Sequence, residues 1–135
     1  EVEESDYDSD DFLKLKKIFK YDSNGNVVEF SDYDSEGKLK GKGIPKYDSD
    51  GNKVERSYYD SDGNLKSKSV SKYDTNGNCV ERSNYYSNMT KKWTHIYKYD
   101  TKNRKIEELQ YEYESKFGEF QQLSTFKTTY EYEEY

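Results

Sequence analysis

The residues able to carry out chemistry are few in this chain. It has one histidine, His95, and one cysteine, Cys79. A zinc site needs three or four ligands, and His95 has no cysteine or histidine partner at metal-binding spacing. The sequence also lacks a phosphate-cradling glycine loop and a Gly-x-Ser-x-Gly motif. We therefore predict a protein that is not an enzyme, with no catalytic residue, metal or cofactor, and His95 as a solvent-facing strand residue.

Acidic turns raise a calcium hypothesis. The segment Asp48-Ser49-Asp50-Gly51 places carboxylates at alternate positions, as the start of an EF-hand loop does. That loop also needs a glutamate at its twelfth position, and counting from Asp48 this position is Tyr59. Asp and Gly already satisfy the demands of a tight turn. Turn chemistry is therefore the favoured explanation, and calcium binding is the alternative.

Aromatic residues suggest a binding site instead. We expect Trp93, Tyr97 and Tyr99 to share one face of a sheet with Tyr73. Flat rings beside polar groups stack on sugar rings or on a partner protein. Tyrosine is also a strong strand former, so a purely structural role is the alternative. These four residues are the candidate ligand-binding residues.

The elements that position these residues belong to a 26-residue internal repeat. One tyrosine row consists of Tyr21, Tyr47, Tyr73 and Tyr99, and a second consists of Tyr7, Tyr33, Tyr59, Tyr85 and Tyr111. The rows alternate at steps of 14 and 12 residues, so that each step accommodates one strand and one turn. The pattern predicts an all-β fold, an antiparallel meander of about ten strands built from 26-residue double-hairpin repeats, in a single-layer or curled sheet.

Turn length sets the register of this sheet. Both steps are even, and a strand that pairs with two successive hairpins should contain an even number of residues, so the loop should be even too. We therefore predict a four-residue loop, Asp48–Gly51, closed by Tyr47 and Asn52, with positive φ at Gly51. A three-residue bulged loop would need a compensating bulge in every strand.

This register predicts two unequal faces. One side should carry Val54, Leu65, Tyr73 and Val80, and the other Glu55, Val70 and Glu81. Small residues such as Gly41, Gly43 and Ser69 interrupt the first face. We expect a thin sheet held by cross-strand pairs rather than by a thick core.

The repeat changes toward both ends of the chain. Asp11 replaces the turn glycine in the first copy, and Met89 replaces it in the fourth. We divide the chain into a tyrosine–aspartate β-hairpin array over residues 1–113 and a C-terminal part over residues 114–135. The latter is predicted to be a capping hairpin, with a turn around 116–118 and a frayed, acidic, tyrosine-rich tail.

Bulk composition restricts the partners. The 135 residues are 37% charged and 30% hydrophobic, with a net charge of −6. Nucleic-acid binding relies on clustered Lys and Arg, so this balance predicts no nucleic-acid partner. No apolar run approaches membrane-spanning length, which predicts no membrane insertion.

The turns resemble the tyrosine–aspartate (YD) repeats of rearrangement-hotspot-type and teneurin-type surface proteins and bacterial toxins. The shared pattern is Tyr-Asp-x-x-Gly-Asn/Arg, carried here by Tyr47–Asn52 and its copies over about residues 7–113. The resemblance implies an exported or cell-surface β-structure, which in that family winds into a shell that encloses a toxin or binds carbohydrate and receptors. The steps of 12 and 14 residues are shorter than the family's usual step, and about ten strands are too few to enclose anything.

The functional expectation is a non-enzymatic structural or adhesion repeat module of an exported or cell-surface protein. Its partners would be copies of itself or other surface proteins, reached through a sheet edge or through the face formed by Tyr47, Val54, Leu65 and Tyr73. The alternative is a carbohydrate- or protein-binding module that uses the aromatic face near Trp93.

Overall fold

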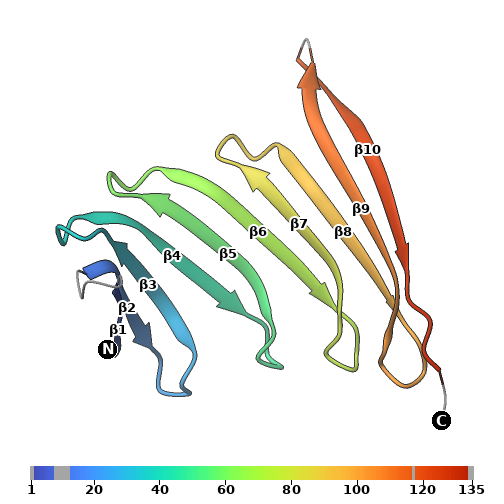
Figure 1. Cartoon of the computed structure of the whole chain (residues 1–135), viewed down its shortest axis with the longest axis horizontal. Coiled ribbons are helices and arrows are strands. Elements are labelled where there is room, and N and C mark those ends of the chain that lie inside the picture. Colours follow the sequence, from blue (N-terminus) through green and yellow to red (C-terminus); the bar gives the residue numbers. More distant parts are fainter. Residues whose placement is uncertain (1, 8–12, 117, 134–135) are drawn as a thin grey trace.

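The computed structural model describes residues 2–7, 13–116 and 118–133. It contains one ten-stranded antiparallel sheet in which each strand pairs with the next along the chain (Figure 1). The strands are β1 (Val2–Tyr7), β2 (Leu13–Tyr21), β3 (Val27–Tyr33), β4 (Leu39–Tyr47), β5 (Lys53–Asp60), β6 (Leu65–Tyr73), β7 (Cys79–Tyr86), β8 (Lys91–Tyr99), β9 (Lys105–Lys116) and β10 (Glu119–Thr129). The predicted all-β meander is confirmed. The altered first turn, residues 8–11, and Phe117 lie outside the described residues.

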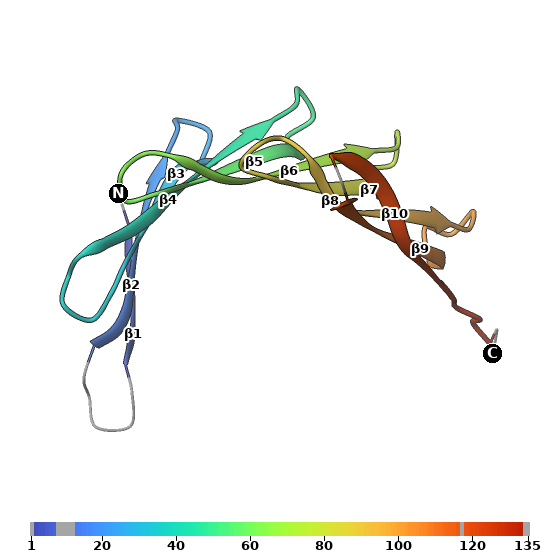
Figure 2. The same ribbon diagram turned by 90° about the horizontal axis from the view of Figure 1, so that it is seen from above.

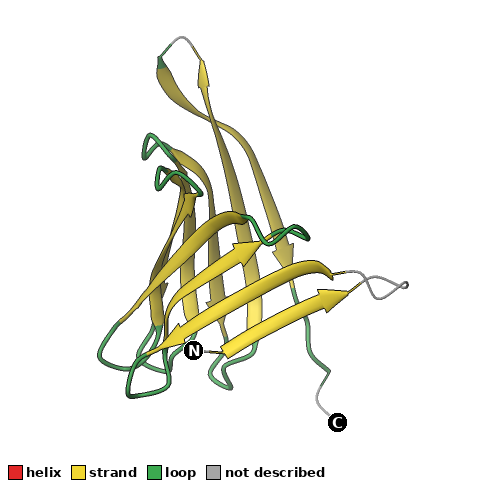
Figure 3. Ribbon diagram, turned by 90° about the vertical axis from the view of Figure 1, so that its left-hand side faces the viewer, coloured by secondary structure: helices red, strands yellow, loops and turns green. Residues whose placement is uncertain are grey.

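The sheet is a single layer that bends and twists. Seen from above, it forms an arch from the β1–β2 hairpin to the β9–β10 hairpin (Figure 2). Figure 3 shows the strands turning progressively along this arch. Among the described residues no hydrophobic side chain is fully buried, and no helix is long and apolar enough to cross a membrane. Side chains are therefore covered by their neighbours on the same face rather than by a second layer.

The seven hairpin loops from β2–β3 to β8–β9 contain three residues, so the predicted four-residue loop is wrong. The Asp48 N–H donates to the Asn52 carbonyl at 3.0 Å, and the Gly51 N–H donates to the Asp48 carbonyl at 3.2 Å. Gly51 has φ +83°, as predicted. The loop is thus a type I turn followed by a left-handed glycine, closed by Asp48 and Asn52.

A β-bulge next to each three-residue loop restores the even spacing that an odd loop breaks. Tyr47 lies opposite Lys53 and Lys46 lies opposite Glu55, which leaves Val54 as the extra residue on β5. Each of the nine strand pairs has one register shift, which lies next to the turn in the first eight pairs and at Leu123, away from the turn, in the β9–β10 pair. The compensating bulge that a three-residue loop demands is therefore a regular part of the repeat.

The two faces follow from this register. Glu55 lies opposite Val70, and Glu81 lies opposite Lys72, two residues along β6, so these residues share one face as predicted. We call it the charged face. Tyr73 alternates with Lys72 and lies on the other face, the aromatic face, which also carries Phe30, Tyr58, Trp93 and Tyr97.

The prediction for Leu65 is wrong. Leu65 lies opposite Tyr59, and Tyr59 lies opposite Lys42 on the charged face. The bulge places Lys66 between Leu65 and Ser67, and this extra residue changes the face on which the start of β6 lies. Val54 and Val80 are themselves the bulge residues of their strands.

The turn aspartates hold the loops together. The Asp48 Oδ1 atom accepts the backbone N–H groups of Asp50 at 3.0 Å and Asn52 at 2.8 Å. The Asn52 side-chain amide also donates to Asp48 Oδ2, at 3.1 Å. The Asn52 amide and these N–H groups hold the pKa of Asp48 below its ordinary value. Similar bonds lower the pKa values of Asp22, Asp60, Asp74 and Asp100.

Lysine–glutamate bridges cross the strands on the charged face. Glu55 on β5 accepts Lys46 from β4 at 3.0 Å and Lys68 from β6 at 2.8 Å. The same arrangement recurs 26 residues earlier at Glu29 and 52 residues later at Glu107. Such half-exposed ion pairs stabilise weakly one by one, but they connect neighbouring hairpins along the array.

We expect the left-handed turn position to respond in opposite directions to two substitutions. Gly51→Val should lower the free energy of unfolding by about 1–2 kcal/mol, because a β-branched residue fits positive φ poorly. Met89 has φ +64° at the same turn position. Met89→Gly should therefore raise the free energy of unfolding by up to about 1 kcal/mol. Urea denaturation of both variants measures these changes. A neutral Gly51→Val would contradict the turn assignment.

Candidate ligand-binding site

Aromatic rings line one stretch of β8 on the aromatic face. Trp93, His95 and Tyr97 alternate along the strand, so their side chains point to the same side. The ring centroids of Trp93 and His95 are 4.7 Å apart, and those of His95 and Tyr97 are 6.1 Å apart. These rings form a continuous wall along β8.

Two of the predicted site residues have a structural role. The Tyr99 hydroxyl donates to the Cys79 carbonyl at 2.9 Å, and the Tyr73 hydroxyl donates to the Lys53 carbonyl at 3.0 Å. Each bond joins the end of one strand to the start of the strand immediately before it. Tyr73 and Tyr99 share the aromatic face with Trp93 and Tyr97, but their phenols are engaged by the backbone. A ligand-binding role for the four residues stays a prediction.

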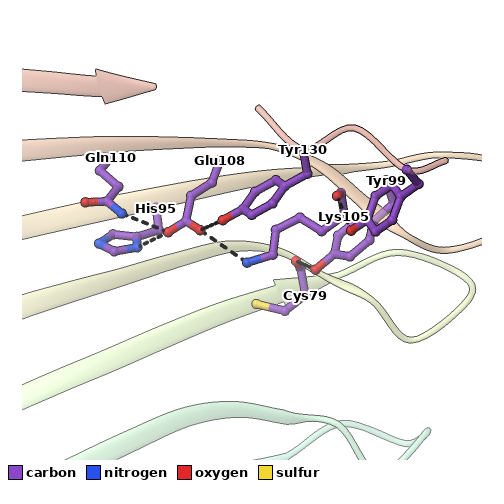
Figure 4. A network of polar contacts seen from close by, with 8 residues as sticks. Cys79, His95, Tyr99, Lys105, Glu108, Gln110 and Tyr130 are labelled. Carbon is purple, nitrogen blue, oxygen red and sulfur yellow. Dashed lines mark hydrogen bonds and ion pairs between the residues drawn. The ribbon is translucent and has the colours of Figure 1, made fainter. Parts of the chain in front are cut away.

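Glu108 is the centre of a polar network beside this wall (Figure 4). It is buried and contacts His95 Nδ1 at 3.0 Å, Lys105 Nζ at 3.1 Å, Gln110 Nε2 at 3.0 Å and the Tyr130 hydroxyl at 3.3 Å. Burial alone would raise the pKa of Glu108, but Lys105, Gln110 and His95 hold it below its ordinary value.

His95 therefore differs from the solvent-facing residue that we predicted. Its ring is half-buried between Trp93 and Tyr97, and Glu108 on the neighbouring strand holds it. The repeat contains a signal for the pairing of His95 with Glu108. Glu108 replaces the arginine found at the same position in the two preceding copies, Arg56 and Arg82.

The C-terminal tail packs against the β8–β9 hairpin. The Tyr130 N–H donates to the Ile106 carbonyl at 3.0 Å, and the Tyr132 hydroxyl donates to the Lys105 carbonyl at 2.8 Å. The Arg104 guanidinium lies 4.7 Å from the centre of the Tyr132 ring. Tyr132 thus repeats the tyrosine-to-carbonyl bond of the array. Tyr130 and Tyr132 hold the tail against the hairpin, although we predicted a frayed end. The predicted boundary between residues 113 and 114 falls within β9.

A groove of about 230 Å³ crosses the aromatic face from β5 to β8. Its lining residues are Lys53, Glu55, Arg56, Ser69, Ser71, Arg82, Asn84 and Trp93. Serines replace large side chains on β6, so this strand forms a low floor between the neighbouring strands. Trp93 closes the groove on the β8 side.

The groove is positively charged in an otherwise acidic protein. Arg82 Nε donates to Ser71 Oγ at 3.4 Å, and Asn84 Nδ2 donates to Ser69 Oγ at 3.0 Å. Within the described part of the chain, neither Arg56 nor Arg82 has a carboxylate at ion-pair distance. The carboxylate of Glu55, the one acidic residue in the lining, is held by lysines of the charged face. Two guanidinium groups therefore remain available to a ligand.

Sequence reasoning missed Arg56, Arg82 and Asn84. The signal was the 26-residue alignment, in which the position of Arg56 and Arg82 is Phe30 in one copy and Glu108 in another. A position that varies this widely within one repeat is not fixed by the fold.

The turn aspartates do not gather into a metal site in the residues that the structure describes. Asp48 uses both carboxylate oxygens within its own turn. Over the described ranges, no group of three or more histidine, cysteine, aspartate or glutamate side chains is placed to hold a metal ion. The turn chemistry by itself explains why aspartate occurs here.

Comparisons with known proteins relate the fold to solved structures. No family model and no curated protein sequence matches the chain. A Bacteroides fragilis protein of unknown function is similar in structure, with a TM-score of 0.59 at 18% identity, and the match covers 85% of this chain and 92% of that one. The likeness is one of fold.

Two further similarities are more distant. A Photorhabdus luminescens Tc holotoxin pore structure gives a TM-score of 0.44 at 15% identity over 82% of this chain and 7% of that chain. The TcdB2–TccC3–Cdc42 complex gives 0.43 at 12% identity over 94% of this chain and 10% of that chain.

Proposed function

We propose that this chain is a non-enzymatic structural or adhesion repeat module of an exported or cell-surface protein, and that it works by joining further β-strands at its edge. The repeat pattern supports this role, because each hairpin is stabilised mainly by the hairpins on either side of it. The resemblance of the turns to YD repeats supports an exported or surface location. The non-enzymatic role is supported by the sequence, which has one histidine and one cysteine and lacks a phosphate-cradling glycine loop and a Gly-x-Ser-x-Gly motif.

The single observation that carries the proposal is that β10 has an unpaired edge and exposed apolar side chains. Among the described residues, one side of this 11-residue strand pairs with β9 and the other pairs with nothing. Phe126, Leu123 and Phe120 are 57%, 52% and 43% exposed. Natural edge strands are usually kept apart by prolines, charges or a covering element, and β10 has no proline and only two charged residues.

The geometry of β10 identifies which backbone groups would accept a partner. The Tyr130 N–H points inward to the Ile106 carbonyl. Because N–H groups alternate along a strand, those of Phe126 and Thr128 also point inward and those of Thr125 and Lys127 point outward. The simplest partner is a second copy, since two β10 edges can pair antiparallel about a twofold axis.

The positions of four side chains bear on the surface through which copies of the chain would associate. We predicted an edge or the face formed by Tyr47, Val54, Leu65 and Tyr73. Leu65 lies on the charged face and Tyr73 on the aromatic face, so these four side chains do not form one surface. The β10 edge is therefore the route that we propose.

We expect the chain to self-associate through β10. Sedimentation velocity over a hundredfold range of concentration should show dimers or larger species for the wild-type chain. Thr125→Pro removes an outward N–H and should give a monomer. Thr125→Ala is the matched control, because it also loses the Thr125 contact with Gln122 but keeps the N–H. A wild-type chain that stays monomeric, or a Thr125→Pro variant that associates equally, would overturn the proposal.

A second candidate function is that of a binding module, and the groove beside Trp93 favours it. The fold of the array does not require unpaired arginines on this face. Their presence beside an aromatic ring is a specific reason to consider a ligand.

A further inference from the structure

We propose that the groove between β5 and β8 binds an anionic saccharide, a sugar chain bearing carboxylate or sulfate groups. This inference deepens the second candidate function and does not depend on self-association. It starts from the charge of the groove. Arg56 and Arg82 lie on β5 and β7, on either side of the serines of β6. Guanidinium groups suit carboxylates and sulfates because their planar N–H donors form paired hydrogen bonds with two oxygens.

The repeat shows that these arginines are not structural necessities. At the same position β3 has Phe30, whose ring lies over Gly43 of β4, and β9 has Glu108. Both alternatives are accommodated in the same sheet. The cationic stretch is therefore confined to the middle of the array, where the ring of Phe30 bounds it on one side and the network of Glu108 on the other.

The rest of the lining suits a sugar ring. The Asn84 amide and the hydroxyls of Ser69 and Ser71 supply neutral donors and acceptors beside the two arginines. Trp93 offers a large ring at the end of the groove, and such rings provide apolar contact area next to polar groups. A saccharide presents the same mixture of hydroxyl groups and apolar ring faces.

Shape favours a chain over a single ion. The groove extends across four neighbouring strands, which corresponds to about 14 Å at the usual strand spacing. It is partly open to solvent rather than an enclosed cavity, so it could receive a segment of a polymer. We favour a saccharide over a nucleic acid because the lining combines two arginines with serine, asparagine and tryptophan side chains, whereas a nucleic-acid backbone is bound by longer clusters of lysine and arginine.

The test uses defined probes and isothermal titration calorimetry. The probes are a galacturonate oligomer, a sulfated dextran oligomer, neutral maltohexaose and a single-stranded oligodeoxynucleotide. We expect binding of one or both anionic saccharides, and which of them binds identifies the anion. The double variant Arg56→Gln/Arg82→Gln should weaken this binding at least about tenfold, because it removes charge-assisted hydrogen bonds. Trp93→Ala should weaken it as well.

The matched control is Lys38→Gln/Lys40→Gln. It changes the net charge equally, at exposed residues of the β3–β4 turn and the start of β4, and should leave the affinity unchanged. Arg56 and Arg82 are exposed, so their variants should keep the fold, which circular dichroism checks. Repeating the titration in the Thr125→Pro background separates binding from self-association.

Four outcomes would overturn the inference. These are no binding of either anionic saccharide, equal binding of maltohexaose, tighter binding of the oligodeoxynucleotide, and an affinity that the arginine double variant leaves unchanged.

Discussion

Gly43→Ala should lower the free energy of unfolding by about 1–3 kcal/mol, although alanine is normally the better residue in a strand. A Cβ atom at Gly43 would overlap the ring of Phe30 from the neighbouring strand. That ring has little room to move, because Phe19 and Tyr58 flank it at centroid distances of 6.2 and 6.4 Å. Urea denaturation followed by circular dichroism measures the change.

A double-mutant cycle tests the cause of this destabilisation. Phe30→Leu shortens the side chain that the new methyl group would meet. Phe30→Leu should therefore lower the free energy of unfolding less in the Gly43→Ala background than in the wild type, so that the effects of the two substitutions are not additive. A neutral Gly43→Ala, or strict additivity with Phe30→Leu, would show that the ring does not lie over Gly43.

Acid should destabilise the sheet markedly. Bound N–H groups and amides lower the pKa of turn aspartates such as Asp48 below the ordinary 3.8, and lysines lower the pKa of Glu55 below 4.5. A group whose folded pKa is depressed stabilises the fold fully above its unfolded pKa and loses that effect as the pH falls through the folded value. The melting temperature should therefore hold near neutral pH and fall between about pH 5 and pH 3.

Asparagine at the turn positions provides the control. Replacing Asp22, Asp48, Asp60, Asp74 and Asp100 by asparagine keeps a side-chain acceptor in each loop but removes its titration. This variant should be less stable than the wild-type chain at pH 7. Its melting temperature should also change less with pH than that of the wild type. An unchanged pH dependence would mean that the turn carboxylates contribute nothing to acid sensitivity.

Much of the fold could be predicted because the repeat records it directly. The tyrosine rows gave the number of strands, and the turn glycines gave the positions with positive φ. The loop length could not be predicted from parity, because a bulge such as that at Val54 allows an odd loop in an even repeat. The wrong face for Leu65 has the same origin, since a bulge next to it is invisible in a pattern of alternating residues.

Less of the candidate site could be predicted. Trp93 and Tyr97 were placed correctly on one face, because strand alternation alone decides this. The groove depends on the pairing register of β5, β6 and β7, which places Arg56 and Arg82 on either side of the small residues of β6. Only the register of three neighbouring strands reveals it. The position of Tyr132 against the β8–β9 hairpin likewise depends on a tail that does not follow the repeat.

Hydrogen exchange at β10, measured by nuclear magnetic resonance at low and high protein concentration, tests the central functional proposal most directly. The outward amides of Thr125 and Lys127 should exchange rapidly in dilute protein and become protected as concentration rises. The inward amides of Phe126 and Thr128 should be protected at both concentrations, because they bond to β9. Outward amides that exchange equally fast at all concentrations would contradict the proposal that this edge joins further strands.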